Sequence, residues 1–409
     1  MYKRLMAVAA TALLIALPLS AQSGDTASFE AVEAASLFSE IPWGVSLSPG
    51  GALLAGIVEG RLCIVEIESA EERCAPMPEG VNSAVNGSPD NPGLIWSPDE
   101  SHLVMTEDVL RMFQDSDIWV FDVAASAFEN VTEDGVEGGL IFGEESAGTL
   151  LDYMPAWGDS DTLYFFRSDY QPNMEDSSML LYRYTLSTAS LDLMADVTDE
   201  IGWLSVYYRP QVSPDGTQMV LPVFAGDPEA PANGLWLIDL VSGEVEQLAA
   251  KADIALAIQA DEDARFLVPV NPQWVNGGRA VMVTITDYGN QASVPTNFVY
   301  IDVATGALTP MIDFSGIPIS DLLENPRRPD LPPMPWDSVV NAAGSKLYFM
   351  PNPNLGEPAI YALSLPPDGS PPALVAEVEY ASTLYTTSPR MGGRRALLGG
   401  WLYTLEPAG

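Results

Sequence analysis

The chain has 409 residues, and its 17 basic residues stand against 56 acidic ones, giving a formal net charge of −39. Proteins bind nucleic acid and anionic lipid headgroups by neutralising phosphate with lysine and arginine, so this balance argues against both kinds of partner. It suits metal cations, basic partners, or simple solubility in a salty or acidic medium.

The first 21 residues have the pattern of a secretory signal peptide. Lys3 and Arg4 precede an apolar run from Leu5 to Leu19 that is too short to span a bilayer. The small residues of a cleavage site follow, so the mature chain is expected to begin at Gln22. The alternative is an N-terminal anchor or a buried helix. No later segment reaches 18 apolar residues, which predicts a soluble, monomeric protein of the periplasm or cell exterior, with no membrane insertion after signal removal.

Two cysteines, Cys63 and Cys74, are the only ones in the chain. They flank the apolar residues 64–67 and a polar turn at 68–71, so they are expected to face each other across a hairpin. In an oxidising compartment, an even count at short separation favours a disulfide.

A strand pattern then repeats through residues 42–409, with about 55 residues for each unit. The clearest units begin at Trp96-Ser97-Pro98-Asp99-Glu100 and at Val212-Ser213-Pro214-Asp215-Gly216. Each continues with an apolar run, a variable loop, a second apolar run, a turn and a last run, which describes a four-stranded meander. The third strands are expected to start near residues 62, 118, 181, 235, 298, 360 and 402.

The residue types explain the pattern. Proline presets φ near −65° in a turn, and aspartate and glycine tolerate the reversal. Aromatic and β-branched residues in the third strands fit a sheet that is buried on both faces. No helical periodicity of useful length lies between the strands, which excludes a doubly wound fold. The sequence therefore predicts an all-β, seven-bladed β-propeller of four-stranded antiparallel blades, in preference to six or eight blades.

The ring needs one more strand than the repeats provide. The last unit reaches Gly409 directly after its third strand, and the N-terminal segment 22–41 contains an alternating stretch from Ser28 to Ala34. If that stretch completes the last blade, the exposed sheet edges disappear. The alternatives are a disordered leader or a short helix.

The motif Trp96-Ser97-Pro98-Asp99-Glu100, followed by Asp117-Ile118-Trp119-Val120-Phe121-Asp122, resembles the WD40-like, TolB-type propeller repeat. The resemblance covers residues 42–409 and implies the propeller fold, together with protein or ligand binding. The family also includes the propellers of prolyl oligopeptidase-type peptidases. However, this chain has no Gly-x-Ser-x-Gly elbow to carry their hydrolase chemistry.

Long loops are expected on one face of the ring, between second and third strands and between blades, while the short turns lie on the other. The candidate binding residues on the long-loop face are acids, aromatics and arginines. They are Arg167, Asp169, Tyr170, Trp203, Tyr207, Tyr208, Arg209, Asp287 and Tyr288.

Missing residues restrict the chemistry. His102 is the only histidine and is expected on the short-turn face. A Ser-His-Asp triad or a histidine-ligated zinc site would have to use this one imidazole, which argues against both kinds of site. No cofactor is predicted; acid oxygens could hold Ca²⁺, but the spacing of a calcium loop is absent. The sequence favours a secreted, non-catalytic module that recognises protein or glycan. The alternative is a carboxylate-based hydrolase, with or without Ca²⁺, that acts on glycans or lactones.

Overall fold

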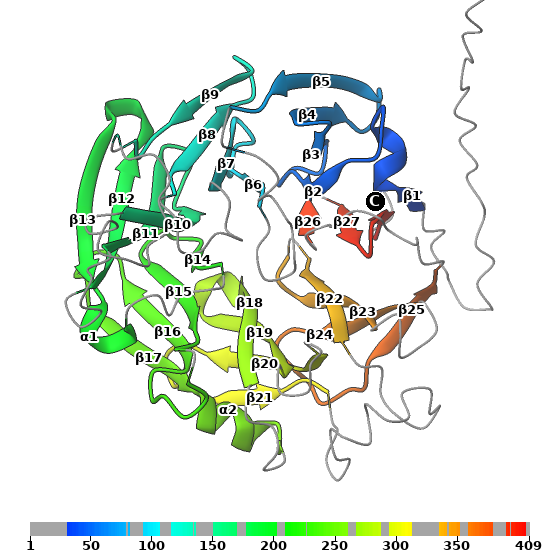
Figure 1. Cartoon of the computed structure of the whole chain (residues 1–409). Helices are drawn as coiled ribbons and strands as arrows, with labels where there is room; N and C mark the ends of the chain where they lie inside the picture. The colour runs from blue at the N-terminus through cyan, green and yellow to red at the C-terminus, as the bar shows by residue number, and fades with distance from the viewer. Residues whose placement is uncertain are drawn as a thin grey trace, which may run out of the picture.

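The structure is a computed structural model, and it contains seven four-stranded antiparallel sheets arranged in a ring (Figure 1). It describes residues 31–78, 81, 93–106, 116–133, 135, 150–169, 177–202, 209–225, 227–260, 267–287, 294–312, 335–341, 343–351, 359–378, 390–392 and 394–405. The predicted seven-bladed propeller is therefore confirmed. The proposed signal peptide, residues 1–21, lies outside the described residues.

Within each of the first six blades, the strands follow one another in sequence, with the first strand nearest the central axis (Figure 1). Blades one to three consist of β2 (Trp43–Leu47), β3 (Leu53–Val58), β4 (Arg61–Glu66) and β5 (Glu71–Pro76); β6 (Ile95–Trp96), β7 (His102–Thr106), β8 (Ile118–Asp122) and β9 (Ala127–Asn130); and β10 (Leu150–Trp157), β11 (Thr162–Asp169), β12 (Ser178–Thr185) and β13 (Ser190–Asp196).

Blades four to six follow the same plan. They consist of β14 (Gln211–Val212), β15 (Gln218–Val223), β16 (Gly234–Asp239) and β17 (Val245–Ala250); β18 (Leu267–Val275), β19 (Ala280–Asp287), β20 (Val294–Asp302) and β21 (Leu308–Pro310); and β22 (Pro335–Val340), β23 (Lys346–Pro351), β24 (Ala359–Ser364) and β25 (Ala373–Glu377). The described helical segments are all short: η1 (Ala34–Leu37), η5 (Leu186–Thr188), α1 (Thr198–Ile201), α2 (Lys251–Ala257) and η6 (Asn276–Gly278). In the part of the chain that the structure describes, no helix is long and apolar enough to cross a membrane.

The seventh blade joins the two ends of the chain. It contains β26 (Arg390–Gly392), β27 (Arg395–Leu398) and β28 (Trp401–Thr404), and its fourth strand is β1 (Ala31–Glu33). β1 pairs antiparallel with β28, with Ala31 opposite Tyr403. The expected ring-closing strand is confirmed over Ala31–Glu33, while residues 28–30 lie outside the described residues and Ala34 begins η1 instead.

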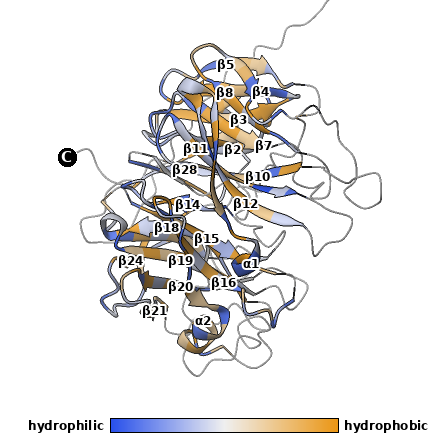
Figure 2. Ribbon diagram, turned by 90° about the vertical axis from the view of Figure 1, so that its left-hand side faces the viewer, coloured by the Kyte–Doolittle hydropathy of each residue, from blue (hydrophilic) through white to orange (hydrophobic). Residues whose placement is uncertain are grey.

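The apolar core is divided among the gaps between blades. Seven large clusters of buried side chains each join two adjacent blades; one, for example, packs Leu62 and Ile64 of blade one against Leu103 and Phe121 of blade two. A strand inside such a stack is buried on both faces, which explains its continuous apolar sequence. Figure 2 shows these strands mainly in hydrophobic colours.

Tryptophans on three of the innermost strands also connect neighbouring blades. Each indole N–H donates to a backbone carbonyl on the innermost strand of the preceding blade. These bonds run from Trp96 to Ser46 at 3.4 Å, from Trp157 to Ile95 at 3.0 Å, and from Trp274 to Gln211 at 3.0 Å. The tryptophan of the repeat therefore belongs to the assembly of the ring.

The serine and aspartate of the repeat shape the short turn between first and second strands. In blade four, the Asp215 carboxylate accepts hydrogen bonds from the hydroxyls of Ser213 and Thr217, and Ser213 Oγ accepts from the N–H of Gln218. These bonds hold the pKa of Asp215 below its ordinary value, first through Ser213 and then Thr217. Blade two repeats the arrangement with Ser97 and Asp99. The motif is a local device for reversing the chain.

The predicted disulfide is present. Cys63 on β4 lies opposite Cys74 on β5, their Cα atoms are 4.1 Å apart, and the two sulfurs are bonded. The bond links the third and fourth strands of blade one, as expected. A structural disulfide is typical of an oxidising compartment.

Trp157→Phe is expected to lower the free energy of unfolding by roughly 0.5–1.5 kcal/mol, because it removes the hydrogen bond from the indole to the carbonyl of Ile95 in the preceding blade. Trp401→Phe is the matched control. Its indole nitrogen is buried and has no hydrogen-bond partner among the described residues, so the same substitution removes an unsatisfied donor. Denaturant unfolding measures both. Equal destabilisation by the two variants would contradict the proposed role of the inter-blade bond.

Candidate functional site

One end of the ring carries the connections from second to third strands and from one blade to the next. We call it the long-connection face. In blades two to six, the second-to-third connections are residues 107–117, 170–177, 224–233, 288–293 and 352–358. In blades one and seven, they are tight turns made only of Glu59 and Gly60 and of Gly399 and Gly400. The connections are therefore unequal around the channel mouth.

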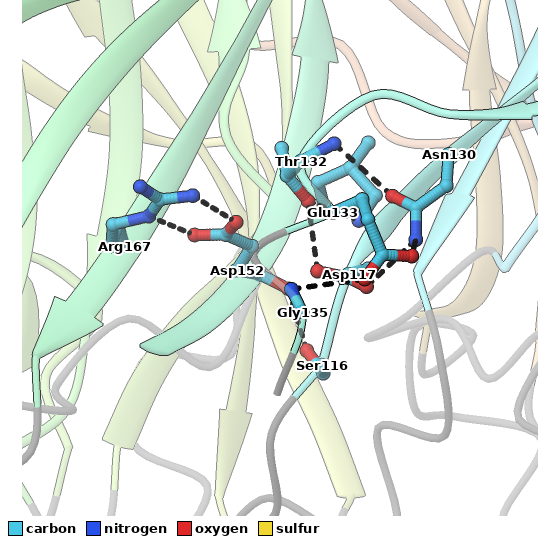
Figure 3. Close-up of polar contacts among 9 residues, drawn as sticks. Ser116, Asp117, Asn130, Thr132, Glu133, Gly135, Asp152 and Arg167 are labelled. Carbon is cyan, nitrogen blue, oxygen red and sulfur yellow. Dashed lines mark hydrogen bonds and ion pairs between the residues drawn. The ribbon is translucent and has the colours of Figure 1, made fainter. Parts of the chain in front are cut away.

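A buried ion pair lies at this face in blade three. Asp152 stands near the start of β10, opposite Arg167 near the end of β11. Arg167 donates from Nε and from one terminal nitrogen to the two carboxylate oxygens, both at 2.6 Å (Figure 3). The side chain of Asp152 is 1% exposed and that of Arg167 13%. The guanidinium also lies over the ring of Tyr182, 5.1 Å from its centroid. Arg167 is thus fixed in orientation while part of it reaches solvent.

The end of blade two holds this pair in place. Ser116 precedes β8; its hydroxyl donates to the carbonyl of Asp152 at 2.7 Å, and its own carbonyl accepts from the Asp152 N–H at 2.9 Å. Next to it, the Asp117 carboxylate accepts from Asn130 Nδ2 at 2.7 Å and from the Thr132 hydroxyl at 3.3 Å (Figure 3). Backbone and side chains of two blades therefore converge on one buried carboxylate.

Burial determines the protonation of Asp152. Desolvation raises its pKa to about 6, because it outweighs the hydrogen bonds and the positive charge that Arg167 supplies. The negative charge of Asp117 adds to the rise. A carboxyl that titrates near neutral pH can exchange a proton under working conditions, which an ordinary aspartate does not.

A second buried carboxyl lies on the innermost strand of blade six. Asp337 of β22 is 5% exposed, and its Oδ2 accepts a hydrogen bond from the N–H of Gly399, in the tight turn of blade seven, at 2.9 Å. Desolvation raises the pKa of Asp337 to about 6, and the single backbone donor opposes this only partly.

Both carboxyls lie beside a β-bulge. A register shift interrupts four innermost strands, β2, β10, β18 and β22. At each shift the innermost strand advances by three residues while the neighbouring strand advances by two, so the innermost strand contains one extra residue. In the first three of these bulges, one residue has a left-handed φ: Gly44 at 60°, Met154 at 53° and Asn271 at 49°. A bulge turns side chains away from their regular alternation and is common next to functional sites. Four innermost strands therefore carry side chains that depart from the regular alternation.

The structure brings few of the predicted binding residues together. Arg167 and Asp169 lie within β11, and Asp287 ends β19, so these residues belong to strands that run further than expected and not to loops. Arg209 is partly buried before β14. Five of the candidates lie outside the described residues: Tyr170, Trp203, Tyr207, Tyr208 and Tyr288. His102 starts β7 directly after a short turn, at the end of the strand away from the long-connection face, as expected.

Sequence reasoning missed Asp152 and Asp337. Each is an acid inside an otherwise apolar stretch of a first strand, Leu150-Leu151-Asp152-Tyr153 and Pro335-Trp336-Asp337. Burying a carboxylate in a strand that is covered on both faces costs free energy. An acid inside an apolar first strand is therefore the sequence feature that could have identified these two residues.

Two solved structures of oligogalacturonate lyases resemble this chain over nearly their whole length. One, described as in complex with manganese, has a TM-score of 0.58 and 13% identity, covering 96% of this chain and 97% of that one. The other, from Vibrio parahaemolyticus, has a TM-score of 0.55 and 13% identity, covering 93% and 98%. At this identity the likeness shows the fold.

A weaker match is to a putative TolB from Agrobacterium tumefaciens, with a TM-score of 0.39 and 13% identity, covering 69% of this chain and 87% of that one. No protein-family model matches the sequence, and a search of curated proteins finds no match. The TolB-type resemblance of the repeat stays a prediction.

These comparisons correct the expected function. The sequence favoured a non-catalytic binding module because it contains no familiar catalytic motif. That expectation is wrong: the oligogalacturonate lyases are enzymes built on a propeller of this architecture, which favours the enzymatic alternative over the binding module. The physical reason for the error is that propeller enzymes assemble their sites from residues on separate blades, which leaves no contiguous motif.

The manganese in one of these neighbours raises the question of a metal. Among the described residues, the one group of three metal-ligating side chains is Cys63, Glu72 and Cys74, and both its sulfurs are joined in the disulfide. A coordinating cysteine must be a free thiolate. With His102 the only histidine, a metal here would take mainly oxygen ligands, and among the described residues no group of three carboxylates comes close enough together to hold one by itself.

Asp152→Asn is expected to reduce the free energy of unfolding by roughly 3–5 kcal/mol, because it leaves the Arg167 charge without its counter-ion. Replacing both partners, as Asp152→Leu with Arg167→Met, should restore much of that loss. Denaturant unfolding at pH 7.5 tests this. A double variant as unstable as the single one would show that the pair is not coupled.

The buried Asp337 predicts a pH-dependent stability. Its folded pKa of about 6 lies above the ordinary 3.8, so the folded state holds the proton more tightly. The stability from this group is complete below pH 3.8 and is lost as pH rises through 6, by about 3 kcal/mol in all. Asp337→Asn should remove this part of the slope in denaturant unfolding between about pH 4 and pH 7. A wild-type curve parallel to that of the variant would contradict the buried titration.

Proposed function

We propose that this protein is an enzyme that acts on a carbohydrate at the channel mouth of the long-connection face. The geometry at this face carries the proposal: the buried Asp152 fixes the partly exposed guanidinium of Arg167, and the buried Asp337 carboxyl, with one backbone donor, has its pKa raised to about 6. Groups with such pKa values are concentrated at sites of acid–base chemistry. The likeness in fold to oligogalacturonate lyases supports the same class of substrate.

The geometry suggests different roles for the three residues. Arg167 is the partly exposed member of its pair, so it is the group that contacts substrate oxygens and stabilises negative charge as a bond breaks. Asp152, at 1% exposure, is a positioning residue that fixes the guanidinium and balances its charge. Asp337 is the candidate general acid or base, because its carboxyl is not committed to a cation among the described residues.

The charge of the chain points to a neutral carbohydrate. Oligogalacturonate is a polyanion, and a protein with a formal charge of −39 repels polyanions over the distance at which charges act in solution. Asp152 also neutralises the guanidinium of Arg167. A neutral glycan meets neither obstacle. The proposed substrate therefore differs from that of the structural neighbours.

The disulfide and the N-terminal sequence pattern support a site of action outside the cytoplasm. The Cys63–Cys74 bond requires an oxidising compartment to persist, and residues 1–21 carry the features of an export signal. Polymeric carbohydrate is encountered there.

The test is an assay of the purified protein, without residues 1–21, on neutral and anionic oligosaccharides, glycosyl esters and lactones. Turnover of a neutral glycan is expected. Asp337→Asn and Arg167→Lys should each lower kcat/KM by about 10²-fold or more, because one removes a titrating group and the other the fixed guanidinium fork.

Glu246→Gln is the control. Glu246 is exposed on β17, the outermost strand of blade four, so this change should leave activity as it is. Circular dichroism and unfolding curves establish that each variant is folded. Absence of turnover on every substrate, or full activity in both site variants, would refute the proposal.

A further inference from the structure

Blade one exposes two large apolar side chains at the long-connection face. Trp43, the first residue of β2, is 55% exposed, and Ile41, two residues earlier, is 58% exposed. β2 is an innermost strand (Figure 1), and Trp43 is its first residue, at the end that belongs to the long-connection face. A tryptophan half in water forgoes the free energy that its burial would provide, so its position needs an explanation.

The same position is filled differently in other blades. In blades one, three and five, the residue directly before the bulge of the innermost strand is Trp43, Tyr153 and Val270, respectively. Tyr153 is 6% exposed and Val270 3%. The bulge alone therefore does not force exposure, and blade one departs from the pattern with the largest side chain of the three.

The bulge in β2 has the same left-handed backbone step as those in β10 and β18, here at a glycine. Gly44 follows Trp43 with φ at 60°, a conformation that glycine adopts without strain. After it, Val45 and Ser46 return to the buried interior of the blade. The strand thus presents one aromatic outward at its start while its other residues remain packed.

The second-to-third connections next to Trp43 are short. Trp43 pairs with Ile57 of β3, and β3 ends in the tight turn of Glu59 and Gly60. Blade seven, next to it in the ring, has the equally tight turn of Gly399 and Gly400. The second-to-third connections are therefore shortest on the side of the mouth where Trp43 is exposed.

We propose that Trp43 is a stacking platform for one ring of a neutral sugar at the channel mouth. The apolar C–H face of a pyranose packs flat on an indole, and this contact needs no charge, which suits a strongly acidic protein. Trp43 and Ile41 together offer far less apolar area than the roughly 800 Å² per partner of a stable protein interface. A single sugar ring matches the area available.

The proposal deepens the proposed function and relies on it for the class of ligand. Trp43 lies on the same face as Arg167 and Asp337, but on blade one, whereas they belong to blades three and six. A glycan bound on Trp43 at one side of the mouth can extend toward those residues. Trp43 then holds a sugar ring that is distant from the bond under attack.

Isothermal titration with cellohexaose, xylohexaose and mannohexaose, with trigalacturonate as the anionic comparison, tests the platform without requiring catalysis. At least one neutral hexasaccharide should bind with Kd below about 1 mM. Trp43→Ala should weaken that binding about tenfold or more, and Trp43→Phe less. Leu256→Ala, which removes a 79% exposed apolar side chain from α2, is the matched control and should bind as the wild type does.

Binding of no neutral hexasaccharide, or equal affinity in Trp43→Ala and wild type, would overturn the proposal. The two hypotheses fail separately. If a neutral glycan is turned over, and Trp43→Ala has the Kd and KM of the wild type, the proposed enzymatic function is supported and the stacking platform is refuted. If binding depends on Trp43 but no substrate is cleaved, the stacking platform is supported and the proposed enzymatic function is refuted.

Discussion

The contact between adjacent blades is the constraint on which this structure depends. No blade can bury its two faces alone, so each shares an apolar cluster with the next, and tryptophans on innermost strands add hydrogen bonds to the preceding blade. The ring is complete only when β1 from the N-terminal side pairs with β28 from the C-terminal side. Closure removes the open edge and fixes all innermost strands around one channel.

That closed ring explains how carboxylates can be kept in a dry interior. Asp152 is held by bonds to Arg167 of its own blade and to Ser116 of the blade before. Asp337 reaches across to the N–H of Gly399 in the following blade. Each acid is therefore placed by two blades at once, and the rigid stack prevents the rearrangement that would let water in. A raised pKa persists because the environment cannot relax.

The strongly acidic composition and the apolar chemistry of Trp43 are consistent with one another. A surface that repels anions loses the easiest way of binding a ligand, which is charge attraction. Recognition then depends on stacking and hydrogen bonds, which neutral sugars offer. The oligogalacturonate lyases share the fold, and the acidic charge of this chain is the reason why a neutral substrate is proposed for it.

The sequence by itself determined the features that depend on near neighbours along the chain. The Ser-Pro-Asp turn closes through hydrogen bonds among residues 213–218, and Cys63 meets Cys74 across a single hairpin. The number of blades followed from counting such units. The site could not be read in the same way. Arg167 and Asp152 face each other because of strand register and a bulge, and Asp337 meets a turn 62 residues away. Only the tertiary structure decided which acids are buried, because desolvation depends on every blade that surrounds a carboxyl and not on the residues beside it.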